Sequence, residues 1–289
     1  MAHPRVVWWV KLAAAACLAA CGRPDTPRAG EPIRANNTTA TEVATVTGEW
    51  PLELGAMLVV QSDTENLAIV VYPVTPGAAE ASLTLVSSSG DTVRRRMALG
   101  VQDSLHCGDA TIGRLSRSTP PLWSIGIQST AAVPLRTDSM DALTATDSAQ
   151  ISTEMGRLAS AVDAEQASRF TGLPFTLSTL RRLRVDGHEV VAAQVVRRVN
   201  QEADPLEERT LIVAERATAT LEQFTTVHSG RSQGSEDNID HFDLLAALRT
   251  ARGTLLVIAR ERPTGTTFDI LERNAAGVWT VKWSRSIVC

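Results

Sequence analysis

The segment FDLLAALRTARGTLLVIARERPTGTTFDILERNAAGVWTVKW, residues 242–283, decides the fold class of this chain. Short apolar or β-branched runs follow one another at even spacing, and turn-forming residues separate them. The expected strands are Phe242–Leu248, Thr254–Arg260, Thr267–Arg273 and Val278–Trp283. We therefore predict a four-stranded antiparallel meander. Alternation in the last strand places Trp279, Val281 and Trp283 on one face, either as core anchors or as a sugar-stacking surface.

The C-terminal β region extends upstream of this meander and covers residues 169–289. Its earlier strands are expected at Phe175–Leu183, Glu189–Val196 and Arg209–Ala214. The dipeptide Asp186-Gly187 favours a tight hairpin turn between the first two of these strands. We expect Ser229–Asp240 to form a polar loop, because it is rich in Ser, Gly and acidic residues.

Two further regions precede this one, an N-terminal β region at residues 49–136 and a helical connection at residues 137–168. The strands expected in the first are Ala56–Val60, Leu67–Tyr72, Ser82–Val86, Thr92–Ala98 and Trp123–Gln128. In the second, Asp147 is the expected N-cap, and an apolar stripe follows at Ile151, Met155, Leu158 and Val162. The predicted fold class is mainly β (α+β), with antiparallel meanders and one amphipathic helix between two β regions. These regions either share one core or form separate domains.

The N-terminus has the features of a bacterial export signal. Arg5 and Lys11 precede an apolar run that is too short to span a membrane, and this run ends in Leu18-Ala19-Ala20-Cys21. The tetrapeptide resembles the lipobox of bacterial lipoprotein precursors. This resemblance implies that residues 1–20 are a signal peptide and that Cys21 carries the lipid after cleavage. Residues 21–48 are rich in Pro and Thr, so we expect a disordered tether there.

A lipid at Cys21 would make the membrane the first partner of the chain, with another envelope protein as a candidate second partner. We expect the protein in the cell envelope, anchored by the lipid and facing the periplasm or the cell exterior. Gly22, and not Asp, follows the cysteine, which favours the outer membrane if the host has two membranes. The formal net charge of −4 gives no bulk attraction to nucleic acid.

The chain has four cysteines, of which Cys17 belongs to the expected signal peptide and Cys21 is the expected lipid site. The remaining pair, Cys107 and Cys289, is expected to form a disulfide in an oxidising compartment. The alternative is two free thiols with His106 in a metal site, but two cysteines and one histidine do not complete a zinc ligand set. We expect no metal and no cofactor.

Arginines cluster on both sides of the expected hairpin turn. If the hairpin forms, they lie across from one another and need either local acids, such as Glu189, Glu202, Glu207 and Glu208, or an anionic ligand. The candidate anion-binding surface consists of Arg181, Arg182, Arg184, Arg197 and Arg198. A second cluster, Arg94-Arg95-Arg96, is expected to be a solvated strand face, with contact to anionic headgroups as the alternative.

The string Gly230-Arg231-Ser232-Gln233-Gly234 matches the G-x-S-x-G pattern of a hydrolase nucleophile elbow. That elbow requires an apolar strand before it and a helix after it, and the flanking residues favour neither. The only later histidine is His241, nine residues on. We therefore expect a flexible Gly/Ser loop at this string.

The segments Leu255–Ala259 and Gly277-Val278-Trp279 resemble, in outline, the calcium-binding blade repeats of some secreted bacterial proteins. The sequence Ala251-Arg252-Gly253 stands where those repeats have an Asp-rich turn, so calcium binding is not implied there. Another acidic cluster, expected to be part of a solvated loop, consists of Glu236, Asp237, Asp240 and Asp243 with His241. The favoured function is a membrane-anchored envelope lipoprotein acting as a non-enzymatic binding or scaffold module. The alternatives are an envelope hydrolase using Ser232 and a calcium-dependent adhesion module.

Overall fold

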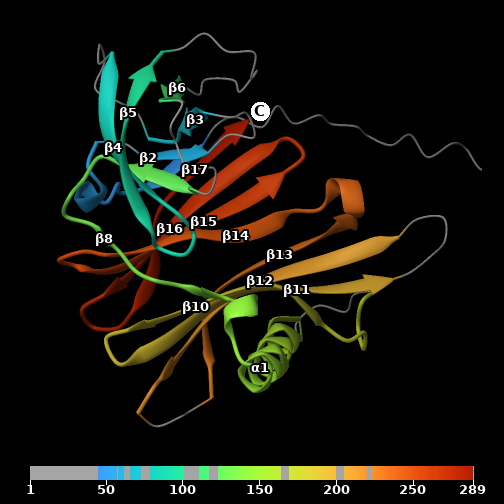
Figure 1. Cartoon of the computed structure of the whole chain (residues 1–289). Coiled ribbons are helices and arrows are strands. Elements are labelled where there is room, and N and C mark those ends of the chain that lie inside the picture. Colours follow the sequence, from blue (N-terminus) through green and yellow to red (C-terminus); the bar gives the residue numbers. More distant parts are fainter. Residues whose placement is uncertain are drawn as a thin grey trace, which may run out of the picture. The chain divides into compact units, whose positions relative to one another are not determined.

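A computed structural model describes residues 45–56, 58–61, 66–72, 79–100, 111–116, 123–163, 169–199, 205–219 and 223–288. These residues form antiparallel β-sheets and one α-helix, which confirms the predicted mainly-β fold class (Figure 1). The expected lipidation site, Cys21, and both cysteines of the expected disulfide lie outside the described residues. The short 3₁₀-helices among the described residues are η1(Leu52–Leu54), η2(Met140–Ala142) and η3(Glu236–Asn238).

The N-terminal β region closes into a six-stranded barrel with the order β2-β3-β6-β5-β4-β7. Its strands are β2(Leu58–Gln61), β3(Leu67–Val70), β4(Glu80–Val86), β5(Thr92–Leu99), β6(Thr111–Leu115) and β7(Ile125–Ile127). Leu83 and Met97 are among the buried side chains that fill its interior. A Cβ atom on Gly126 would lie 2.7 Å from Cγ2 of Val59, so a side chain at this position of β7 would force the core side chains to shift. The barrel is therefore packed solid around this glycine.

The predicted meander is confirmed as the centre of a second sheet, the meander sheet, with the order β1-β17-β16-β15-β14-β8. Its strands are β1(Val46–Gly48), β8(Val133–Pro134), β14(His241–Arg249), β15(Gly253–Arg262), β16(Gly265–Asn274) and β17(Trp279–Val288). A third sheet, the hairpin sheet, has the order β13-β12-β11-β10-β9. Its strands are β9(Asp138–Ser139), β10(Thr176–Val185), β11(His188–Val199), β12(Leu206–Ala217) and β13(Thr225–Ser235).

A β-bulge in β17 overturns the expectation that Trp279, Val281 and Trp283 share one face. Ile270 pairs with Trp283 while the next residue of β16, Leu271, pairs with Val281, so Lys282 is the extra residue. An extra residue inverts the alternation of side chains beyond it. Trp279 consequently packs toward the hairpin sheet, and Trp283 packs toward the barrel.

One hydrophobic cluster joins the barrel to the meander sheet. The rings of Trp50 and Tyr72 stack 3.8 Å apart, and the ring of Trp283 meets Trp50 edge-on at 5.0 Å. The indole N–H of Trp50 donates to the carbonyl of Gly55 at 2.8 Å, so this buried aromatic has its polar atom satisfied. The two β regions of the sequence thus contribute to a common core.

The hairpin sheet is covered on both faces. One face, with Val190 and Val213, packs on the meander sheet. The other face packs on α1(Ala145–Asp163) through the predicted stripe, of which Ile151 and Met155 are buried. The helix begins three residues earlier than expected, because the hydroxyl of Thr144 accepts the backbone N–H of Asp147 at 3.1 Å and caps the first turn.

One sequence-based expectation about a loop is wrong, and one strand was not predicted. The expected loop at Ser229–Asp240 is for the most part strand, because Ser229 to Ser235 pair in register with β12. Strand β6 lies where no strand was expected, and its Gly113 sits against Met97 inside the barrel. Both segments contain glycine and polar residues, which are not typical of strands, and both are stabilised by pairing with neighbouring strands.

Candidate functional site

The best-formed candidate site lies at the β10–β11 turn of the hairpin sheet. Asp186 and Gly187 have φ angles of 50° and 75°, which is the left-handed geometry that a two-residue hairpin turn requires. Val185 pairs with His188 across this turn, so the predicted hairpin is confirmed. The tight turn fixes the positions of His188 and Glu189 at the start of β11.

A pocket of about 650 Å³ opens beside this turn, and we call it the hairpin pocket. It is lined by the turn, by the end of β12 and by the first turns of α1. Its lining residues are Asp147, Gln150, Arg182, Arg184, Val185, Asp186, Gly187, His188, Glu189, Arg216 and Thr218. Polar and charged side chains therefore dominate its wall.

The three arginines of the hairpin pocket are not equally neutralised. Arg216 forms a close ion pair with Glu189, with its Nε donating at 2.7 Å, and lies over the ring of Phe224 at 4.3 Å. Arg182 donates to Asp138 at 3.0 Å and lies 3.7 Å from a carboxylate oxygen of Glu189. The Nε atom of Arg182 is buried without a hydrogen-bond partner.

Arg184 is exposed and has no hydrogen bond or ion pair with any residue that the structure describes. The carboxylate of Asp186, two residues further along the chain, forms an ion pair at 2.9 Å with Arg249, which lies outside the pocket. Arg182 and Arg216 are paired with Asp138, Asp147 and Glu189. Arg184 is therefore the guanidinium of the hairpin pocket that has no ion pair among the described residues.

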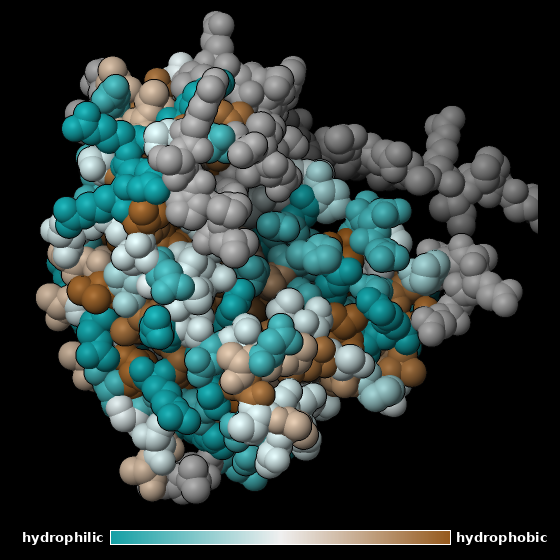
Figure 2. Space-filling view, viewed as in Figure 1, coloured by the Kyte–Doolittle hydropathy of each residue, from teal (hydrophilic) through white to brown (hydrophobic). Residues whose placement is uncertain are grey.

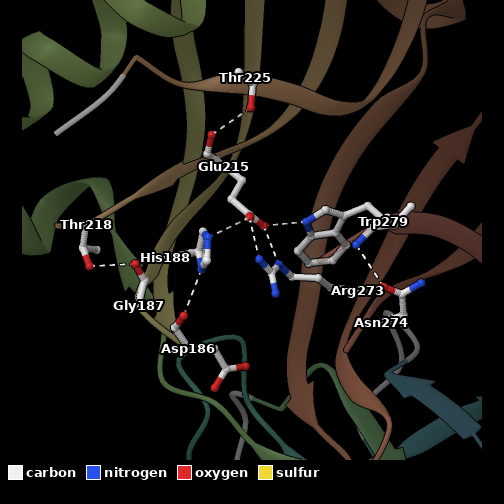
Figure 3. A network of polar contacts seen from close by, with 10 residues as sticks. Asp186, Gly187, His188, Glu215, Thr218, Thr225, Arg273, Asn274 and Trp279 are labelled. Atoms are coloured by element: carbon white, nitrogen blue, oxygen red, sulfur yellow. Dashed lines mark hydrogen bonds and ion pairs between the residues drawn. The ribbon is translucent and has the colours of Figure 1, made fainter. Parts of the chain in front are cut away.

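A partly buried carboxylate, Glu215, lies behind His188 and holds the pocket wall to the meander sheet (Figure 3). Arg273 donates to both of its oxygens at 2.8 Å, and the indole N–H of Trp279 donates at 2.6 Å. Burial by itself would raise the pKa of Glu215, but the bonds from Arg273 and Trp279 outweigh burial and hold that pKa below its ordinary value. The same ion pair raises the pKa of Arg273.

The imidazole of His188 connects this network to the hairpin turn. Its Nδ1 lies 2.9 Å from the carbonyl oxygen of Asp186, and its Nε2 lies 3.6 Å from Glu215 (Figure 3). Thr218 closes the same turn from β12, since its hydroxyl donates to the carbonyl of Gly187 at 2.7 Å. The pocket wall is thus held rigidly by hydrogen bonds from two sheets.

The five arginines expected to form one anion-binding surface are divided between two ends and two faces of the hairpin sheet. They do not lie across from one another, because Arg184 pairs with Glu189 and Arg197 pairs with Glu208 in the strand register. Arg182 and Arg184 line the hairpin pocket, while Arg181 donates to Ser88 of the barrel at 2.8 Å.

At the far end of β11, Arg197 and Arg198 pair with acids of β12. Glu208 is fully buried and accepts hydrogen bonds from Arg197 at 2.7 Å and Arg231 at 2.8 Å. Burial by itself would raise the pKa of Glu207, but bonds from Arg209 and Arg198 hold it below its ordinary value. The expected pairing of arginines with local acids is confirmed here, whereas Glu202 lies outside the described residues.

Ser232 does not occupy a nucleophile elbow. It lies within the extended strand β13, and its hydroxyl accepts the backbone N–H of Asp240 at 3.1 Å. The nearby His241 contacts Arg209 and not the serine. A G-x-S-x-G string needs a sharp strand-to-helix turn to expose its serine, and a strand gives no such exposure.

The acidic cluster that was expected to be part of a solvated loop is partly engaged within the protein. Asp240 is paired with Arg260 and lies 3.6 Å from Arg262. Within the described ranges, no group of three or more His, Cys, Asp and Glu side chains is arranged to hold a metal ion. No described helix is long and apolar enough to cross a membrane.

Sequence reasoning missed the residues that complete the hairpin pocket from a distance. Asp147 and Gln150 come from α1, and Arg216 comes from β12, so none is close in sequence to the turn. The adjacent Glu215-Arg216 pair inside a β-branched run was the available signal, because charges in a buried strand require partners. No protein-family model, curated protein or solved structure matches the chain.

Proposed function

We propose that the mature chain is a lipid-anchored envelope protein that binds a small anionic ligand in the hairpin pocket. The observation that carries this proposal is Arg184, an exposed guanidinium without a partner among the described residues, on the wall of a polar pocket. Guanidinium groups bind carboxylate and phosphate oxygens through paired hydrogen bonds. Arg182, whose Nε has no partner, lines the same pocket.

The ligand class follows from the remaining lining residues. Asp147 and Gln150 can accept hydrogen bonds from hydroxyl or amino groups, while Arg184 and Arg182 take an oxyanion. A volume of about 650 Å³ is within the usual range for small-molecule pockets. We therefore expect a carboxylate- or phosphate-bearing molecule that also has hydroxyl or amino groups, such as an acidic sugar.

Ligand binding is tested by calorimetry on the mature chain with Cys21→Ser. The probes are a sugar phosphate, a sugar carboxylate and the parent neutral sugar. We expect the anionic sugars alone to bind, and Arg184→Ala to weaken binding about tenfold, because a charge-assisted hydrogen bond contributes about 1.5–3 kcal/mol. The matched control is Arg136→Ala, an arginine that is 88% exposed and lies outside the pocket. Equal binding of the neutral sugar, or full affinity in the Arg184 variant, would contradict the proposal.

The lipid anchor is tested independently of the pocket. Cells that express the full chain are grown with a labelled fatty acid, and we expect the label on the wild-type protein and not on Cys21→Ser. The support for this proposal is the sequence Leu18-Ala19-Ala20-Cys21 and the Pro/Thr-rich segment that follows it. Label that persists in the Cys21 variant, or its absence from both proteins, would count against the anchor.

A further inference from the structure

The outer face of the barrel sheet formed by β4, β5 and β6 carries arginines. In β5, Met97 is fully buried in the barrel interior, so alternation places Arg94 and Arg96 on the outside, where both are exposed. Arg114 of β6 is also exposed, and it pairs with Ala98, the next outward residue of β5. Three guanidinium groups thus lie on one face, which we call the basic face. Figure 2 shows strongly hydrophilic side chains gathered over β4 and β5.

The basic face has little internal neutralisation. The guanidinium groups of Arg94, Arg96 and Arg114 have no hydrogen bond or ion pair with any described residue. The described acid on the same face is Glu80, which is placed beside Ala98 by the register of β4 and β5. With three cations and one carboxylate, this face is positive although the chain as a whole carries −4.

Most other described arginines form ion pairs with carboxylates. In the two open sheets they pair with carboxylates within 4 Å, often from a neighbouring strand. Arginines paired in this way include Arg182, Arg197, Arg198, Arg209, Arg216, Arg231, Arg249, Arg252, Arg260, Arg262 and Arg273. The arginines of the basic face differ from these, because their guanidinium groups have no ion pair with a described residue. They are therefore available to an external anion.

An anion can bind only on the outer surface of the barrel, because side chains fill the interior. A Cβ atom on Gly113 would lie 2.3 Å from Sδ of Met97, and one on Gly126 would lie 2.9 Å from Cδ2 of Leu85. Backbone this close to the core side chains leaves no room for a ligand inside. The arginines are therefore directed at a partner that meets the outer face of the strands.

We propose that the basic face binds the anionic headgroups of the membrane to which the chain is anchored. This inference rests on the lipid anchor of the proposed function, because the anchor holds the barrel close to a bilayer. The 23 residues between Cys21 and Thr45 can span at most about 80 Å when fully extended. Within that distance the barrel meets the surface repeatedly, and a second weak contact adds strongly to the first.

Lipid headgroups fit the basic face better than a nucleic acid does. Exposed arginines near an anionic bilayer attract it without a shaped groove, and each strengthens binding about fivefold. The basic face includes no aromatic residue on which bases could stack.

The test uses the mature chain with Cys21→Ser, so that any vesicle binding is independent of the lipid. Vesicles contain either phosphatidylcholine alone or equal parts of phosphatidylcholine and phosphatidylglycerol. We expect co-sedimentation with the anionic vesicles alone, and its loss at high salt. The triple variant R94Q/R96Q/R114Q should bind about a hundredfold more weakly. Arg169→Gln, at an exposed arginine outside the barrel, should bind as the wild type does.

Two outcomes would contradict the proposal that the basic face binds lipid headgroups. If the triple variant binds vesicles as strongly as the wild type, these arginines are not the binding residues. If the protein binds heparin but not vesicles, the ligand of the basic face is not a lipid headgroup. Circular dichroism on heating confirms that the triple variant folds, which is expected because the replaced groups have no partners among the described residues. Fatty-acid labelling at Cys21 and sugar binding at Arg184 are measured separately, so failure of the proposed function is distinguishable from failure here.

Discussion

Replacing Glu215 by Gln should destabilise the fold strongly at neutral pH. The carboxylate accepts two hydrogen bonds from Arg273 and one from Trp279, and a glutamine would leave the guanidinium of Arg273 without its counter-charge. Breaking a buried ion pair by removing one partner costs about 3–5 kcal/mol. Both side chains are 11% exposed, so water weakens the effect and we expect about 3 kcal/mol, the lower end of this range.

The assay is urea unfolding followed by tryptophan fluorescence, in which this loss lowers the midpoint by about 1 M. The matched control is Glu154→Gln on α1. Its carboxylate pairs with Arg157 at 2.9 Å, but the arginine is 44% exposed, so the change should be below about 0.5 kcal/mol. Similar losses in the two variants would refute the assigned difference between a buried and a surface pair.

Acid provides a second check on Glu215. Its pKa in the folded protein lies below the ordinary value of 4.5. A carboxyl group with a lowered pKa stabilises the fold above its unfolded pKa and loses that contribution as pH falls through the folded pKa. The difference between wild type and Glu215→Gln should therefore be full at pH 7 and shrink below pH 4.5. A difference that stays constant into acid would show that the charge of Glu215 is not the cause.

Three further predictions concern the cores and the covalent structure. Glu208→Gln removes a fully buried carboxylate charge that accepts hydrogen bonds from two arginines and should cost about 4 kcal/mol in urea unfolding; a loss below about 1 kcal/mol would contradict its role. Gly126→Ala overpacks the barrel and should cost about 2 kcal/mol, whereas Gly156→Ala on α1 should stabilise by about 0.5–1 kcal/mol, so equal effects would be unexpected. Non-reducing peptide mapping should find Cys107 linked to Cys289, and alkylation of both without reductant would disprove the link.

Local sequence pattern was sufficient for the parts of the fold that alternate regularly. The meander strands and the helical stripe show this, since the run around Leu256 is apolar and turn residues separate it from the neighbouring strands. Barrel closure could not be predicted, because it depends on β7 pairing with both β2 and β4. The strand β13 was hidden for a similar reason, since a polar edge strand takes its order from β12.

The candidate site was predictable only in part. The Asp186-Gly187 turn and the arginines beside it are visible in the sequence, and the structure places Arg182 and Arg184 at one pocket. The separation of Arg181 from them follows from alternation, which directs neighbouring strand residues to opposite faces. The contributions of α1 and β12 depend on tertiary packing, so no local pattern could have assigned them to this pocket.

The bulge at Lys282 has a consequence for how the last strand finds its place. Because the bulge inverts alternation between Trp279 and Trp283, each indole enters a different core. A slip of β17 by one residue would withdraw both indoles at once and bring Lys282 toward an apolar interior. The two indoles on opposite faces of β17 therefore specify a single register for this strand, because only that register places both of them in their cores.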